Sequence, residues 1–142
     1  MNQKDYNMLV QRRRPNPPIL KNVILAFLVG GTICLIGQGI LNGYIYIGFS
    51  PADAQNPTVA TVIFLAALAT GTGVYKRLGQ FGGAGAFIPV TGFANAVTSA
   101  AMEFKKEGYI QGIGSKMFIL AGSVIVYGVV TAFVIGLISA II

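Results

Sequence analysis

The stretch NVILAFLVGGTICLIGQGILNGYIYIGFSPA, residues 22–52, contains no charged side chain. Residues 54–75, 78–102 and 117–142 are charge-free as well. About 20 apolar residues in a helix, each rising 1.5 Å, span the roughly 30 Å hydrocarbon core of a bilayer. Because charge-free stretches of this length cannot form the surface of a soluble domain, the sequence predicts an all-α integral membrane protein.

The composition favours the same class and argues against an enzyme. Hydrophobic residues make up 54% of the chain and charged residues 10%, with a mean hydropathy of +0.71, whereas about 25% of residues are charged in a typical soluble domain. Histidine is absent and the four acidic residues are scattered, so the usual general base and the commonest metal ligand are missing. We therefore expect no catalytic site, no metal and no cofactor.

Three of the charge-free stretches are apolar enough to cross a bilayer. They predict transmembrane helices at about residues 23–47, 58–75 and 116–141. With a broken segment at residues 78–107 between the last two, they would form a single polytopic membrane domain, residues 23–142. Few spans enclose only a thin core, so we expect the chain to form a homo- or hetero-oligomer.

Residues 1–22 form a basic, proline-containing arm ahead of this domain. The formal net charge of the chain is +6, and the basic residues before the first span suit anionic lipid headgroups better than nucleic acid. Lys76 and Arg77 follow the second span, whereas residues 44–57 contain no lysine or arginine. Since cytoplasmic loops carry the excess of these residues, the N-terminus is expected on the cytoplasmic side and the first loop outside.

The stretch at residues 78–102 is a poor continuous helix, because it is rich in glycine and contains Pro89. Proline disfavours helical geometry at the preceding residue and donates no backbone hydrogen bond. We expect the segment to divide there, with Thr91 capping a new helix that ends near Gly108. The N-terminal end of that helix would lie within the membrane, where its unpaired N–H groups favour an anion.

The charge pattern after this segment bears on its path through the membrane. If residues 78–102 crossed fully, Lys105, Lys106 and Lys116 would lie outside, against the distribution of positive charge found in membrane proteins. If the segment enters and returns, all three stay inside and the C-terminus lies outside. The sequence favours the re-entrant path, and a fourth span is the alternative.

Two of the helices carry sequence patterns typical of contacts inside the membrane. In the last helix, small residues recur every four positions, which lets another backbone approach closely, either within the chain or from another subunit. These residues are Gly128, Ala132, Gly136 and Ala140. In the first helix, Gln38 lies on a small and polar side, which must face protein or water. It would either bond a neighbouring helix or face a solute.

Several motifs resemble one known family. They are FLVGG at residues 27–31, CLIGQ at 34–38, NPTVAT at 56–61, GGAG at 82–85 with PVTGFAN at 89–95, and AGSVIV at 121–126. These motifs and their spacing, over about residues 6–142, resemble the AC members of the SpoVA family of stage V sporulation proteins.

The resemblance implies a subunit in the inner membrane of the forespore and spore, with its N-terminus on the spore core side. Proteins of this family work with other membrane and soluble products of their operon. The family is associated with uptake of dipicolinic acid, with calcium, into the developing spore and with its release during germination, and a mechanosensitive channel activity is attributed to it. A non-conducting assembly or anchoring subunit is the alternative.

Together, the broken segment and the resemblance give a hypothesis for the solute path. Small residues of the segment would expose backbone and polar groups to the solute, and a residue of the first helix would face them. These residues are Gln38, Gly82, Gly83, Gly85, Pro89, Thr91, Gly92 and Asn95.

Overall fold

The computed structural model of the chain describes residues 3, 6 and 18–141. Most of the N-terminal arm and the last residue lie outside the described residues. All elements within residues 18–141 are helical, and none is a strand. In chain order they are α2 (Ile19–Ile47), α3 (Gln55–Gly71), α4 (Val74–Gly82), α5 (Ala84–Phe87), α6 (Val90–Glu103), the 3₁₀ turn η1 (Phe104–Glu107), the π-helical turn η2 (Tyr109–Gly114) and α7 (Ser115–Ile141).

The structure confirms the predicted fold class, an all-α membrane protein. The helix at Ile19–Ile47 and the continuous helix at Tyr109–Ile141 are each long and apolar enough to cross a bilayer alone. A third crossing exists only if α3 and α4 form one span together, and a sharp bend separates these two helices.

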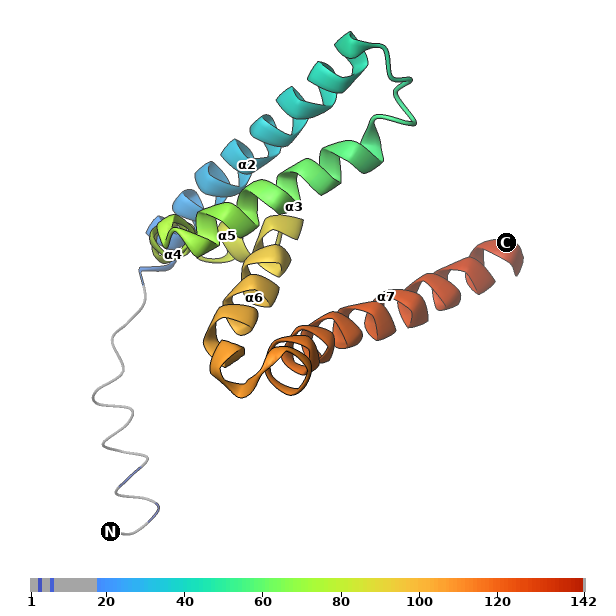
Figure 1. Ribbon diagram of the computed structural model, residues 1–142. Coiled ribbons are helices and arrows are strands. Elements are labelled where there is room, and N and C mark those ends of the chain that lie inside the picture. The colour runs from blue at the N-terminus through green and yellow to red at the C-terminus, as the bar shows by residue number, and fades with distance from the viewer. Residues whose placement is uncertain (1–2, 4–5, 7–17, 142) are drawn as a thin grey trace.

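Helices α2 and α3 run side by side in opposite directions (Figure 1). Helix α2 ends at Gly48, whose φ of +112° is the left-handed conformation that glycine adopts without steric cost. Near this end the hydroxyl groups of Tyr44 and Thr61 share a hydrogen bond of 2.8 Å. It links α2 to α3 near their connection.

The bend between α3 and α4 measures 102°. It occurs at Gly73, whose φ is +77°, so the helix expected at residues 58–75 stops at Gly71 in the structure and a new helix starts at Val74. Lys76 and Arg77 consequently lie on α4, where both are exposed, while Tyr75 on the same helix is buried. Helix α4 is thus amphipathic.

The chain then turns back along the bundle. Helix α5 packs on α2, and α6 packs on α3. In Figure 1, α6 leads from the middle of α3 back towards the end of the molecule where α4 lies. Helix α7 then runs in the opposite sense, and its C-terminal end lies on the same side of the view as the connection between α2 and α3. The segment from α4 to η1 therefore enters the bundle and leaves it by the end at which it entered.

The packed core is small and lies where α3, α4 and α6 meet. It consists of Ala66, Tyr75 and Ala94, each at most 5% exposed. Helix α7 contributes its first turns to packing against α6. Further along α7, a Cβ atom added at Gly128 or Gly136 would meet no described atom within 4 Å. The repeat of small residues thus has no packing partner among residues 18–141.

We predict opposite stability effects for two glycine-to-alanine substitutions. A methyl group at Gly85 would overlap the carbonyl group of Ala26 on α2, whereas one at Gly31 meets nothing within 4 Å. Gly85→Ala should therefore destabilise the protein by about 1–3 kcal/mol. Gly31→Ala should be neutral or stabilising by up to about 1 kcal/mol, because alanine has the higher helix propensity. Unfolding in detergent micelles measures both. Equal effects of the two variants would contradict the packing of α5 on α2.

Candidate functional site

The proline break creates a hydrogen-bonding requirement at the end of α5. In a continuous helix the Ala86 carbonyl would accept from the N–H of Val90, four residues later. Pro89 is extended, with a ψ of 164°, so the helix breaks before Val90, which begins α6, and the Ala86 carbonyl lacks that donor. The hydroxyl of Tyr75 provides it, at a distance of 2.6 Å. Tyr75 is only 3% exposed, so this bond forms where water cannot replace it.

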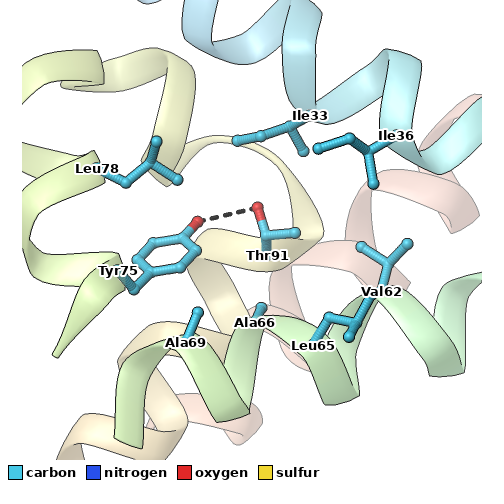
Figure 2. Close-up of a pocket in the computed structure, with 9 residues that line it drawn as sticks. All are labelled: Ile33, Ile36, Val62, Leu65, Ala66, Ala69, Tyr75, Leu78 and Thr91. Carbon is cyan, nitrogen blue, oxygen red and sulfur yellow. Dashed lines mark hydrogen bonds between the residues drawn. The ribbon is translucent and has the colours of Figure 1, made fainter. Parts of the chain in front are cut away.

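Tyr75 also joins α4 to α6. Its hydroxyl oxygen lies 2.9 Å from the hydroxyl oxygen of Thr91 (Figure 2). Since the Ala86 carbonyl can only accept, the phenol proton is used there, and the Thr91 hydroxyl supplies the proton of the second bond. Thr91 is 6% exposed. One phenol thus connects three helices.

The predicted role of Thr91 as a helix cap is wrong. The residue that precedes α6 is Pro89, in an extended conformation, and no side chain caps the helix. Thr91 lies inside the first turn, and its hydroxyl bonds Tyr75. Thr91, Gly92 and Ala94 are buried, so this turn packs against protein. The cavity that Thr91 lines is apolar, whereas an anion site would need polar surroundings.

Asn95 lies one helical turn after Thr91 and bonds the opposite helix. The hydroxyl of Thr70 on α3 lies 3.0 Å from the Asn95 amide oxygen and 2.7 Å from the Ala66 carbonyl oxygen. Thr91 and Asn95, four residues apart, share one face of α6. That face meets Thr70 and Tyr75 across the contact between α6 and the bent pair α3 and α4.

Three glycines of the segment, Gly82, Gly85 and Gly92, pack closely against other parts of the chain. A Cβ at Gly82 would come within 2.5 Å of Val29, and one at Gly92 would overlap the backbone of Phe87. Both glycines are buried, and Gly85 packs on α2 in the same manner. Gly83 is exposed and adopts a φ of +47° with a ψ of −123°, a conformation that requires glycine.

Gln38 does not face the broken segment within this chain. Its amide donates to the side chain of Asn42 at 3.0 Å, on the exposed side of α2. Helix α2 meets α5 at Gly30, and Gln38 lies about 12 Å further along the helix axis at 1.5 Å per residue. Of the residues predicted to line the solute path, the structure brings the glycines, Thr91 and Asn95 together and leaves Gln38 apart from them.

An apolar cavity of about 200 Å³ lies beside the Tyr75–Thr91 pair. Figure 2 shows the two hydroxyl groups bonded to each other among aliphatic side chains from α2, α3 and α4. The lining residues are Ile33, Ile36, Val62, Leu65, Ala66, Ala69, Tyr75, Leu78 and Thr91. Because its lining is almost entirely apolar, this cavity does not suit a small anion.

A more polar cavity of about 420 Å³ lies between the start of α2 and the α4–α5 junction. The side-chain amides of Asn22 and Gln80 line it together with Gly83. In this cavity Gly83, a residue of the predicted solute path, lies beside polar residues of α2 and α4.

Sequence reasoning missed Tyr75 and Thr70. A signal for Tyr75 was available in principle, because a proline inside a membrane segment leaves carbonyl groups that require a donor. The sequence does not indicate which of several hydroxyl groups supplies it, since that depends on the bend at Gly73.

The fold and this site define a polytopic helical membrane protein with a proline-broken segment that hydroxyl groups hold in place. The chain belongs to the SpoVAC/SpoVAEB family of sporulation membrane proteins, whose family description matches residues 22–138. It is similar to stage V sporulation protein AC of Bacillus subtilis (strain 168), with 52% identity over 136 residues, which cover 95% of this chain and 91% of that protein. The resemblance stated from the sequence is thereby confirmed. No solved structure matches the chain.

We predict that Thr70 and Asn95 are energetically coupled. Thr70→Val and Asn95→Ala should each destabilise the protein by about 0.5–1.5 kcal/mol, the range for hydrogen bonds between membrane helices. The double variant should cost clearly less than the sum, because both substitutions remove the same bond. Unfolding in micelles measures the cycle, with Asn42→Ala as the control on the exposed side of α2. Strict additivity would contradict the contact.

Proposed function

We propose that this chain is a non-enzymatic subunit of a channel or transporter in the inner membrane of the forespore and spore. Its solute is dipicolinic acid, carried with calcium into the developing spore and released at germination, and membrane tension gates the path. The break at Pro89 is the observation that carries the proposal. Non-helical backbone at membrane depth is tolerated where it is buried in protein or lines water, and broken helices form the substrate sites of many transporters.

The charges of the chain support a re-entrant path for the broken segment. Exposed Lys76 and Arg77 on α4 and exposed Lys105 and Lys106 in η1 lie on the two sides of this segment. Its entry and return at one end of the bundle would keep all four on the cytoplasmic side, which is the spore core. The crossings are then α2, the bent pair α3 and α4, and α7, and the C-terminus lies outside.

Labelling of introduced cysteines tests this topology. Cys34 is the only native thiol, so Ile110→Cys and Ile141→Cys can be studied in a Cys34→Ala background. Both positions are highly exposed, at 86% and 83%, which makes them a matched pair. An impermeant maleimide should label position 110 from the cytoplasmic face and position 141 from the opposite face of oriented vesicles. Labelling of both from one face would contradict the re-entrant path.

The interior of a single chain does not offer a complete path for a dianion. The cavity beside Tyr75 is apolar, and the core is thin. We therefore place the complete path in an oligomer, of this chain or of this chain with other subunits encoded by the SpoVA operon. The exposed small-residue face of α7, at Gly128 and Gly136, suits close contact with another helix. A non-conducting assembly subunit would use the same face.

Efflux of dipicolinate from liposomes tests the proposed function. Liposomes that contain the purified chain, alone or with the other membrane subunits, should release dipicolinate upon osmotic downshift, and empty liposomes should not. Asn95→Leu should change the efflux severalfold, because it removes both a polar side chain of the proposed path and the bond to Thr70, whereas Asn42→Leu, on the exposed side of α2, should not. Efflux only in the presence of the other subunits, unaffected by Asn95→Leu, would indicate the assembly role. No efflux from either preparation would contradict transport.

A further inference from the structure

The contact between α6 and the bent pair α3 and α4 has an unusual composition. Its buried aliphatic side chains, Ala66 and Ala94, are small, and the larger Ile63 and Leu78 pack against them only partly buried. Its polar part consists of two pairs, Tyr75 with Thr91 and Thr70 with Asn95. We call this contact the polar seam, defined by Thr70, Tyr75, Thr91 and Asn95.

We propose that the polar seam is the gate of the conducting path, closed when its four polar side chains bond one another and open when α6 moves off α3 and α4. The inference rests on the proposed function for what passes through the seam. The opening itself follows from the contacts described above. In the open state the same four side chains would line a polar cleft suited to a small anion such as a pyridine dicarboxylate.

Hydrogen bonds oppose separation at the seam. Association of helices in a membrane has no hydrophobic driving force, because lipid is as apolar as the side chains, and depends on close packing and on hydrogen bonds between helices. Ala66 and Ala94 let the backbones pack closely, and the two polar pairs, about one helical turn apart on α6, supply the directional bonds that must break when the seam opens.

Loss of these bonds requires water, which couples opening to hydration. Tyr75 and Thr91 are 3% and 6% exposed, and a buried hydroxyl without a partner is costly. When the seam separates, its hydroxyl and amide groups must bond water or solute. The open state is thus a wetted cleft without charged side chains, which can bind an anion weakly enough to release it.

The surroundings of the seam allow the movement. Helix α6 lies between Pro89, which interrupts the backbone hydrogen bonds at one end, and Gly108, whose φ of +98° permits a sharp turn at the other. The apolar cavity of about 200 Å³ next to Tyr75 gives the ring and its neighbours space to shift. The second bond of Tyr75, to Ala86, anchors the phenol to α5, and α5 is fixed on α2.

The experiment compares two tyrosine-to-phenylalanine variants. Tyr75→Phe keeps the ring and removes both of its hydroxyl bonds, the one to Thr91 across the seam and the one to Ala86 on α5. Thr91→Val, which removes the seam bond and leaves the bond to Ala86, is therefore measured beside it. Tyr44→Phe removes a similar tyrosine–threonine hydroxyl bond, of 2.8 Å, between α2 and α3 and away from the seam. Both variants are made in the Cys34→Ala background with Ala94→Cys as a probe, because Ala94 lies in the seam and is 5% exposed. Ala66→Cys, on the α3 side, replaces the probe if Ala94→Cys does not fold.

In liposomes, Tyr75→Phe should raise the reaction rate of the probe with a water-soluble thiol reagent at least about tenfold, the factor expected when a buried hydrogen bond is lost. It should also lower the tension at which dipicolinate escapes, and Tyr44→Phe should change neither. A faster probe without any efflux supports the opening of the seam and contradicts only conduction. Equal probe rates in the two variants would overturn the proposal.

Discussion

The need to satisfy backbone hydrogen bonds inside a membrane is the constraint on which this structure depends. A continuous helix meets it without help, but Pro89 interrupts the helix and leaves the Ala86 carbonyl without its usual donor. The Tyr75 hydroxyl supplies a donor at 2.6 Å. For that it must point into the bundle, which the 102° bend between α3 and α4 allows. The bend at Gly73, the burial of Tyr75 and the break at Pro89 therefore depend on one another.

Small residues make this arrangement possible. Gly82 and Gly85 let α4 and α5 approach α2 closely, and Gly92 lets α6 turn tightly after the break. The buried aliphatic side chains between α6 and α3 are likewise small, and the polar pair Thr70 and Asn95 adds a hydrogen bond to this contact. A segment held in this manner can be released by the loss of a few bonds, unlike one packed through large side chains.

Composition alone predicted the fold class, since the charge-free stretches leave few alternatives to membrane helices, and Pro89 indicated a broken segment. The bend at Gly73 was not predictable, because a glycine within an apolar stretch is compatible with a straight helix. Thr91 and Asn95 were identified as polar residues of the segment, but their partners Tyr75 and Thr70 depend on that bend. The sequence indicated that Gln38 lies on the polar side of the first helix. It does not show which side chain Gln38 contacts, because that depends on how the helices pack.

Membership in the SpoVAC/SpoVAEB family relates this arrangement to a sporulation membrane, and the polar seam offers a physical route from a closed helix contact to a hydrated path. The central claim is that Tyr75 holds the broken segment. Solid-state NMR of the protein in lipid bilayers, with ¹³C at the Tyr75 hydroxyl-bearing carbon and at the Ala86 carbonyl, measures it directly. The two carbons should lie within about 5 Å, as a hydrogen bond between their oxygens requires. A pair too distant to be detected, with Tyr75 towards lipid, would contradict the account.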